Sequence, residues 1–271
     1  MRIALLGAGT IARLVLEHVR AGRLPGVEAP TVMARPGSAR ADSLARDFGI
    51  RIVQRREELL ALKPQAVLEA ASHEAVREHL LPMLEAGVSA VVLSAGALAD
   101  DKLRISAENA ARRSACRLYV PSGGIGGLDA LKAACAAGVE TVSIEVSKPP
   151  RAWQGIPFVE RLGIELGGLL EPKVLFDGNA REGVPHFPQN VNIAAVLSMA
   201  GIGFDRTRLR VVADPTLTRN THRIEVQGPS GRISVVLENV PSPENPKTAL
   251  LACYSALAAL REIASSVRYG T

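Results

Sequence analysis

The sequence predicts an α/β protein in which a doubly wound parallel sheet is followed by a smaller α/β domain with an open mixed sheet. Over residues 1–121, buried apolar strands alternate with helical segments, which is typical of parallel sheets. From residue 140 onward, the strands alternate apolar with polar residues instead. That alternation is typical of a sheet with one buried and one solvent-facing side.

The first strand ends in a glycine-rich corner. An apolar run at residues 3–6 is followed by Gly7, Gly9 and Ala12 in the pattern G-x-G-x-x-A, which opens a helix. Gly7 permits a tight turn, Gly9 lets a pyrophosphate approach the backbone, and Ala12 lets the helix pack on the strand. This context predicts a Rossmann domain that binds a dinucleotide. The predicted cofactor contacts here are Gly7, Gly9, Thr10, Ile11 and Ala12.

The end of the second strand bears on the choice between NAD and NADP. An acid at this point accepts the ribose hydroxyls of NAD, whereas an arginine favours the 2′-phosphate of NADP. No acid follows the strand at residues 30–34, but Arg35 does, with Ser38 and Arg40 close behind. The sequence therefore predicts that NADP binds at least as well as NAD. A surface loop charge is the alternative interpretation of Arg35.

Further strand ends in the first domain are also rich in small residues. Ligands of doubly wound sheets lie beyond the carboxyl ends of the strands. Ala71 and Ser94 stand at two such ends, so we expect them to line the cofactor site together with Gly7. The strands are expected at residues 3–6, 30–34, 50–53, 66–70, 89–93 and 117–120. The helices are expected at residues 10–21, 38–48, 57–62, 74–86 and 100–114.

Composition narrows the class of protein. Aromatic residues make up only 3%, which argues against base stacking and so against a nucleic-acid partner. The net charge of +5, from 32 basic and 27 acidic residues, suits small acidic ligands. Three widely spaced cysteines favour a reducing compartment without disulfides. No signal peptide and no apolar stretch of roughly 18 residues is found, so we expect a cytoplasmic protein without a membrane span.

The second domain is predicted to cover residues 122–244 and to carry catalysis and dimerisation, after a dinucleotide-binding domain at residues 1–121. A long apolar helix within residues 245–271 is expected to return to the first domain. The glycine-rich stretch at residues 121–129 is either a hinge or a backbone surface close to the nicotinamide. The strands are expected at residues 140–148, 173–176, 209–213, 222–227 and 232–238.

Histidines are the candidates for proton transfer near neutral pH. His222 begins a predicted strand and shares a face with Ile224 and Val226, so it stands at the edge of an apolar surface. His73 follows a strand end and is a candidate for the cofactor cleft. A hydrogen-bonded structural histidine is the alternative interpretation of His222. No spacing of His, Cys and carboxylate residues indicates a metal site.

Four segments together resemble the L-aspartate dehydrogenase family: PSGGIGGLDAL, KPPRAWQG, FPQNVNIAAVLSMAG and ADPTLTRNTHRIEV, in that order after the glycine corner. The resemblance implies NAD(P)-linked interconversion of L-aspartate with iminosuccinate, or with oxaloacetate and ammonia. In some organisms iminosuccinate enters NAD biosynthesis. The resemblance also implies a Rossmann domain followed by an α/β domain whose sheet helps to form a homodimer.

The resemblance further implies residue roles. His222 corresponds to the catalytic histidine, and Asn190 to the asparagine that contacts the nicotinamide. Gly124 stands where the family usually has an alanine whose backbone amide meets the cofactor, so the geometry there is less constrained. A histidine that titrates near the working pH would serve as both general base and general acid.

A dicarboxylate substrate also needs fixed positive charges. Lys148 and Arg151, with Lys173 or Lys247, are candidates from charge and position alone, and surface solvation is their alternative. Two other functions stay open at this stage: reduction of another imine or keto acid, as in dihydrodipicolinate reductase, and dinucleotide sensing without turnover.

Overall fold

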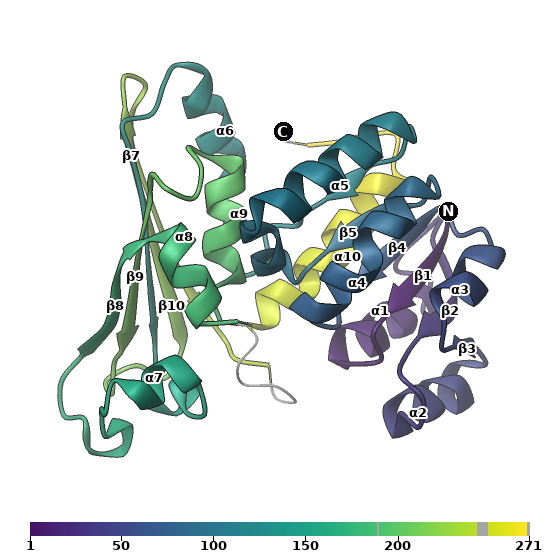
Figure 1. The fold of residues 1–271 in the computed structure, drawn as a ribbon, viewed down its shortest axis with the longest axis horizontal. Helices are drawn as coiled ribbons and strands as arrows, with labels where there is room; N and C mark the ends of the chain where they lie inside the picture. The colour runs from purple at the N-terminus through teal and green to yellow at the C-terminus, as the bar shows by residue number, and fades with distance from the viewer. Residues whose placement is uncertain (189, 243–248, 270–271) are drawn as a thin grey trace. The chain divides into compact units, whose positions relative to one another are not determined.

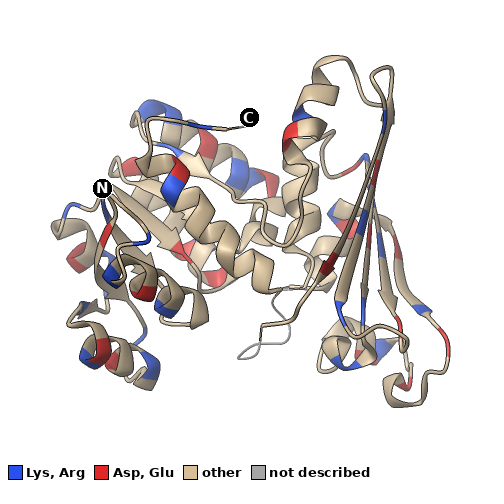
Figure 2. Ribbon diagram, turned by 180° about the vertical axis from the view of Figure 1, so that it is seen from behind, with Lys and Arg blue, Asp and Glu red and all other residues tan. Residues whose placement is uncertain are grey.

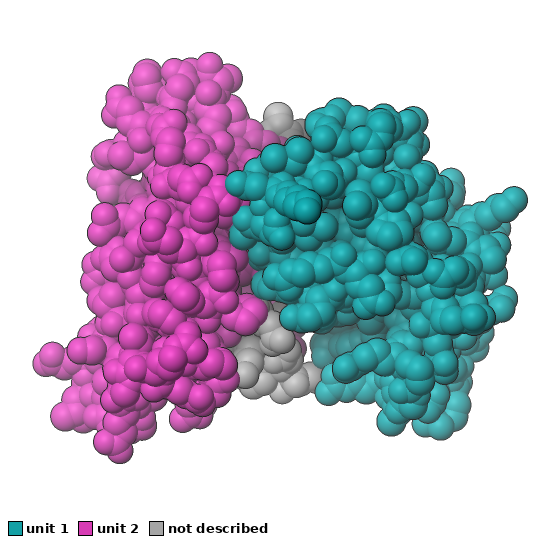
Figure 3. Space-filling view, viewed as in Figure 1, with its two compact units in different colours: residues 1–121, 253–269 teal, residues 122–252, 270–271 magenta. Residues whose placement is uncertain are grey.

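Two sheets organise the part of the chain that the computed structural model describes, which is residues 1–188, 190–242 and 249–269. The first belongs to unit 1, made of Met1–Pro121 and Cys253–Tyr269. The second belongs to unit 2, which starts at Ser122 and runs to Ala252. Figure 3 colours the two units separately, and each is described by itself below.

In unit 1 the described residues form a six-stranded sheet in the order β3-β2-β1-β4-β5-β6, and every pair of neighbours is parallel. This order confirms the predicted doubly wound parallel sheet (Figure 1). The strands are β1 (Arg2–Leu6), β2 (Glu28–Met33), β3 (Arg51–Val53), β4 (Ala66–Glu69), β5 (Ser89–Val92) and β6 (Leu118–Tyr119). The helices are α1 (Thr10–Arg20), α2 (Ala39–Phe48), α3 (Arg56–Ala61), α4 (His73–Glu85) and α5 (Asp101–Arg113), with the 3-10 turn η1 (Ala95–Ala99).

The last helix, α10 (Leu250–Ala264), contributes most of its length to unit 1. Its buried residues Ala256, Leu257 and Leu260 belong to the same apolar cluster as Ile3 and Leu5 of β1. Burial of such side chains is the main favourable free energy of folding. The helix ends at Ala264 rather than near residue 267, and residues 243–248, where its start was expected, lie outside the described residues. No described helix is long and apolar enough to cross a membrane.

In unit 2 the described residues form a five-stranded mixed sheet in the order β11-β10-β7-β9-β8. Only β7 and β9 among these neighbours run parallel, which confirms the predicted mixed sheet. The strands are β7 (Thr141–Lys148), β8 (Lys173–Asn179), β9 (Thr207–Ala213), β10 (Asn220–Gly228) and β11 (Gly231–Asn239). The helices are α6 (Leu128–Ala136), α7 (Pro157–Arg161), α8 (Ala180–Gly183) and α9 (Asn192–Ala200), with the 3-10 turns η2 (Pro150–Trp153), η3 (Leu166–Gly168) and η4 (Val184–His186).

The two faces of the second sheet differ as the alternation predicts. The inner face buries Ile144 and Val146 of β7 beside His222 and Ile224 of β10, which are paired in register. The outer face carries charges, and Figure 2 shows basic and acidic residues interspersed on the strands of this unit. The ion pairs on these strands are Glu145–Arg210 at 3.3 Å, Asp177–Arg208 at 3.0 Å and Glu225–Arg232 at 3.0 Å. Exposed ion pairs of this kind add little stability, so the stability of unit 2 comes mainly from its buried face.

Candidate functional site

The glycine corner of unit 1 has the geometry that a bound pyrophosphate requires. Gly7 has a φ of +105°, and a Cβ there would lie 2.7 Å from the backbone oxygen of Ala70, so no other residue fits this turn. At Gly9, by contrast, a Cβ would meet no atom within 4 Å, so the space over this backbone is open. The side chain of Ala12 is buried where α1 packs on the sheet.

The N-terminus of α1 follows directly. Gly9 is the N-cap residue and supplies no capping side chain to the helix that begins at Thr10. A helix end without a side-chain cap favours an anionic ligand, because N–H groups and the positive end of the helix dipole face it. Ile11 is partly buried against the core, which holds this turn in place. The residues present therefore fit a dinucleotide phosphate.

Glu69, at the end of β4, joins two of the predicted cofactor residues. Its carboxylate accepts hydrogen bonds from the backbone N–H of Ala71 at 2.8 Å and from Ser94, through the N–H at 2.9 Å and the hydroxyl at 2.8 Å. The N–H of Leu93 donates a further bond at 3.2 Å. Burial raises the pKa of the Glu69 carboxyl, and these hydrogen bonds oppose that shift. Glu69 thus ties the ends of β4 and β5 together.

Arg35 is exposed just beyond the end of β2, where the adenosine ribose is expected. Ser38, which the sequence places near the same phosphate, is the N-cap of α2, and its hydroxyl accepts a hydrogen bond from the N–H of Ala41 at 3.3 Å. Arg35 is therefore available for a ligand at this edge, whereas the Ser38 hydroxyl already serves the helix. The predicted cleft residue His73 is buried as the first residue of α4.

His222 lies on the inner face of unit 2 and is held by two partners. Its Nδ1 lies 3.1 Å from the backbone oxygen of Gly124 and 3.1 Å from Nδ2 of Asn239, which itself donates a hydrogen bond to the Gly124 oxygen at 2.8 Å. Since the carbonyl only accepts and Asn239 already donates to it, we assign the ring hydrogen to Nδ1 and the lone pair to Nε2. Nε2 is buried and has no hydrogen-bond partner in the described structure. Burial, and then the charge of Lys148, lower the pKa of His222 to about 3.

Lys148, the last residue of β7, is buried in the same cluster. Its Nζ donates hydrogen bonds to the side-chain oxygen of Asn190 at 3.1 Å and to the backbone oxygen of Asn190 at 3.3 Å. The ammonium lies 5.2 Å from the centroid of the Trp153 ring, a cation–π distance. Burial lowers the pKa of Lys148 to about 7. The group that titrates near neutrality is therefore Lys148, and the expectation that His222 does so is wrong.

The Gly124 carbonyl links two side chains of the cluster, because it accepts hydrogen bonds from both His222 and Asn239. The cofactor contact of the Gly124 amide, which the resemblance implies, stays a prediction. A Cβ at Gly124 would lie 3.3 Å from the Cβ of Ala249, which is tight, and 3.5 Å from Cε1 of His222, which is an ordinary van der Waals contact. An alanine at this position would therefore press on Ala249 rather than on the histidine ring.

The basic residues predicted to bind the substrate differ in their burial. Lys148 is buried beside Asn190, so surface solvation is excluded for it. Arg151 is exposed on η2, and Lys173 is exposed at the start of β8. Lys247 lies outside the described residues. Lys148 is thus the candidate that shares a face with His222.

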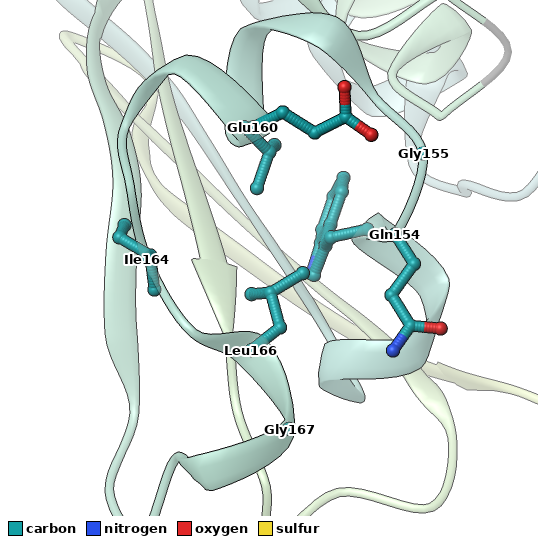
Figure 4. A pocket seen from close by; sticks show the side chains of 8 residues that line it. Gln154, Gly155, Glu160, Ile164, Leu166 and Gly167 are labelled. Carbon is teal, nitrogen blue, oxygen red and sulfur yellow. The ribbon is translucent and has the colours of Figure 1, made fainter.

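A cavity of about 330 Å³ opens elsewhere in unit 2, between η2, α7 and η3 (Figure 4). Trp153 lines it, with Ile164 and Leu166 as apolar walls and Gln154 and Glu160 as polar groups. None of the predicted site residues lines this cavity. Trp153 also contacts the polar cluster, because its ring lies against the ammonium of Lys148. Within the described residues, no group of His, Cys and carboxylate side chains is arranged to hold a metal ion.

The comparisons with known proteins agree with this geometry. Residues 129–263 match the sequence profile "Aspartate dehydrogenase, C-terminal", and residues 7–121 match "Homoserine dehydrogenase, NAD binding domain". L-aspartate dehydrogenase of Methanosarcina mazei is 40% identical over 100% of both chains. The chain belongs to the aspartate dehydrogenase family. L-aspartate dehydrogenase 2 of Bordetella pertussis is 41% identical over 96% of each chain.

Solved structures place the fold in the same family. The crystal structure of aspartate dehydrogenase from Thermotoga maritima superposes with a TM-score of 0.74 and 27% identity, and covers 100% of this chain and 99% of that chain. The WlbA dehydrogenase of Bordetella pertussis, solved in complex with NADH and UDP-GlcNAcA, has a TM-score of 0.51 at 15% identity over 96% of this chain and 83% of that chain, and shows a shared fold alone. Membership of the aspartate dehydrogenase family and the NAD-binding domain together indicate a dehydrogenase that uses a nicotinamide cofactor.

Three residues of the site escaped the sequence prediction. Glu69 lies within the strand expected at residues 66–70, and an acid at the end of an apolar strand signals a buried polar contact. Asn239 follows the strand expected at residues 232–238, and its partner Gly124 is 115 residues away. Asn220 precedes the strand expected at residues 222–227, whereas β10 begins at Asn220.

Proposed function

We propose that the protein is an NAD(P)-dependent L-aspartate dehydrogenase that interconverts L-aspartate with iminosuccinate, or with oxaloacetate and ammonia. One observation carries this proposal: a buried histidine with a partnerless Nε2 lies beside a buried lysine on one face of unit 2. A cation and a base on a single face suit an acidic substrate that must lose a proton. The relatives of similar length that bear this activity in their names support the choice of aspartate.

The cofactor would be held by the residues of unit 1. Gly7 and Gly9 would meet the pyrophosphate, the α1 terminus at Thr10, Ile11 and Ala12 would offer its dipole, and Ala71 and Ser94 would line the strand ends. In unit 2, Asn190 and Gly124 would contact the nicotinamide portion, as the family resemblance implies. When bound, the nicotinamide accepts the hydride, that is, two electrons and one proton, from Cα of the substrate.

His222 would act as the base. L-aspartate carries an ammonium group, which must release one proton as the Cα–H bond breaks and the C=N bond forms. Nε2 of His222 has the lone pair to take that proton, and Nδ1–H bonded to Gly124 fixes the tautomer and the ring. Burial, and then the charge of Lys148, lowers the pKa of His222 in the ligand-free protein. A carboxylate bound to Lys148 would offset this charge and make His222 more basic.

Lys148 would bind one carboxylate of the substrate. Its ammonium is fixed by Asn190 and keeps one hydrogen for a further acceptor, since an ammonium donates three hydrogen bonds and the described residues account for two. An anion would also raise the pKa of Lys148 from its ligand-free value of about 7. Arg151 would serve the second carboxylate. Water would then add to the imine carbon, and release of ammonia would give oxaloacetate.

Arg35 would favour NADP over NAD. It is exposed beyond β2, and no acid is present in the residues that follow the strand. Arg35→Ala should weaken NADP binding roughly tenfold and leave NAD binding unchanged, because only the 2′-phosphate distinguishes them. Arg51→Ala, an exposed arginine on the neighbouring strand β3, is the matched control. An unchanged ratio of the two dissociation constants would reject this role.

We further propose that the enzyme is cytoplasmic and works as a homodimer, with no nucleic-acid or membrane partner. The family resemblance supports the dimer, and the three widely spaced cysteines support a reducing compartment. Light scattering of the purified protein at micromolar concentration tests the dimer. A mass of one chain, 28.6 kDa, would contradict it.

A substrate screen tests the proposed function. The purified protein is mixed with ammonia, NADPH or NADH, and oxaloacetate, 2-oxoglutarate or pyruvate in turn, and L-aspartate is offered with NADP or NAD for the reverse reaction. We expect cofactor oxidation with oxaloacetate that depends on ammonia. Turnover with another keto acid alone would make the protein a different reductase. Cofactor binding without turnover across the screen would make it a sensor.

A further inference from the structure

A second acceptor on the inner face of unit 2 has no partner. Asn220, the first residue of β10, is only 1% exposed, and its Oδ1 makes no hydrogen bond in the described structure. A buried amide oxygen left unpaired costs about 1–3 kcal/mol, so such atoms are rare in folded proteins. Beside a proposed catalytic residue, such an atom is a candidate contact for a ligand.

The neighbours of Asn220 define where this oxygen lies. Asn220 and His222 are two residues apart on β10 and both point to the buried face, so their Cα atoms are roughly 7 Å apart. Thr221 is paired with Ser147, which brings the adjacent residues Asn220 and Lys148 alongside each other at the end of the paired segment.

The side-chain amides of the other two asparagines in the cluster already make hydrogen bonds. Oδ1 of Asn190 accepts from Lys148, and Nδ2 of Asn239 donates to Gly124. Of the unpaired buried side-chain atoms in the described residues, only Oδ1 of Asn220 and Nε2 of His222 belong to unit 2. Both are acceptors, so the group that completes the site must carry at least two hydrogens that it can donate.

We propose that Asn220 recognises the nitrogen of the substrate, with Oδ1 accepting one N–H of the amino group while His222 faces another. This inference rests on the proposed function and names the residue that selects for nitrogen there. An ammonium or an amine supplies donors to both acceptors. A hydroxyl group supplies one hydrogen, and a keto oxygen or a methylene supplies none, so Oδ1 of Asn220 would stay unpaired against them. Asn220 is therefore a specificity-determining residue.

Matched ligands that differ only in the amino group test this role. Dissociation constants are measured in the presence of NADPH, with which an amino acid gives no product, for L-aspartate against succinate and for L-glutamate against glutarate. The variants are Asn220→Leu, which keeps the shape but removes the acceptor, and Asn220→Asp, which keeps an acceptor. Thr221→Ala, on the opposite face of the same strand, is the control. Thermal unfolding verifies that each variant is folded.

We expect the wild-type protein to bind the amino member of a pair more tightly. Asn220→Leu should weaken that member roughly 10- to 100-fold and leave the des-amino member within about threefold, because one buried hydrogen bond is lost. Asn220→Asp should keep the preference, because it keeps an acceptor. If the leucine variant does not fold, Asn220→Ala, which also removes the acceptor, takes its place with the same expected loss. Equal losses for both members would mean a purely structural role and would overturn the proposal, as would a wild-type protein without any amino preference.

The outcome is separable from that of the substrate screen. If L-aspartate is not turned over but Asn220→Leu abolishes the preference for L-glutamate over glutarate, the proposed function fails and the role of Asn220 stands. If L-aspartate is turned over and Asn220→Leu retains the full preference for L-aspartate over succinate, the proposed function stands and the role of Asn220 is rejected.

Discussion

Each unit buries charged or polar side chains near its proposed ligand site, but the two units treat them differently. In unit 1, the carboxylate of Glu69 accepts four hydrogen bonds, three of them from backbone N–H groups. In unit 2, His222 and Asn220 each retain a buried acceptor with no partner in the described structure. Lys148 in the same unit is also buried, and none of the ion pairs among the described residues includes it.

This difference suits a supporting role for Glu69 in unit 1 and a reaction site in unit 2. A buried polar group whose hydrogen bonds are all made holds its neighbours in one arrangement, as Glu69 holds Ala71 and Ser94. Buried polar groups that lack hydrogen-bond partners lower the stability of the free protein. A ligand that supplies the missing donors and charges restores that stability. Substitutions in unit 2 should therefore change chemistry and specificity, whereas those at Glu69 should change stability and cofactor affinity.

The largest effect is expected at His222. His222→Ala removes the proposed proton acceptor, so kcat should fall roughly 10²-fold or more while the dissociation constant of the cofactor stays near the wild-type value. Steady-state rates and fluorescence titration with NADPH measure the two quantities. Arg223→Ala, the next residue on β10 and exposed on the other face, is the matched control. A wild-type kcat in the His222 variant would remove this residue from the mechanism.

Lys148 should produce the next largest effect, and one that depends on pH. Its pKa of about 7 in the ligand-free protein means that the charge needed for a carboxylate is lost above pH 7. We expect kcat/KM for L-aspartate to fall above pH 7, and Lys148→Met to lower it roughly 10- to 100-fold at pH 6.5 and to abolish that alkaline limb. Lys173→Met, an exposed lysine on β8, is the control. A kcat/KM that rises through pH 7 would instead make Lys148 a proton acceptor.

Lys148→Met should increase the stability of the protein, although it decreases kcat/KM. The folded-state pKa of Lys148 is lowered from 10.5 to about 7, so between these values the unfolded chain binds a proton that the folded chain has released. Burial of the charge therefore costs most at or below pH 7, and the cost is relieved as the pH rises toward 10.5. Lys148→Met should raise Tm more at pH 6.5 than at pH 9.5. A gain that is equal at both values would contradict the lowered pKa.

Glu69 should have the smallest effect on chemistry. Glu69→Gln keeps the shape but turns an amide N–H toward backbone donors, so we expect a loss of about 1–3 kcal/mol in the free energy of unfolding. Cofactor affinity should weaken as the ends of β4 and β5 loosen, while the pH dependence of kcat/KM remains. Urea unfolding and pH–rate profiles measure both, with Glu74→Gln, exposed on α4, as the control. A changed pH profile would mean that Glu69 takes part in the reaction.

The sequence was sufficient for the features that depend on local chain geometry. The strand–Gly7–Gly9–helix corner follows from backbone sterics, and the six parallel strands follow from the alternation of apolar strands with helices. The sidedness of β7 and β10 follows from the period of two, which placed His222 on the buried face. These properties involve residues close together in the chain, so pattern alone identifies them.

Only the tertiary structure decided the state of the groups on that face. The pKa of Lys148 depends on its burial, and that of His222 on burial and on the charge of Lys148. These two residues lie on strands far apart in the sequence. The carbonyl of Gly124 meets His222 across 98 residues, and the orphan oxygen of Asn220 is visible only once every neighbour is placed. Hydrogen bonding and desolvation are sums over spatial neighbours, and a linear sequence does not specify which neighbours those are.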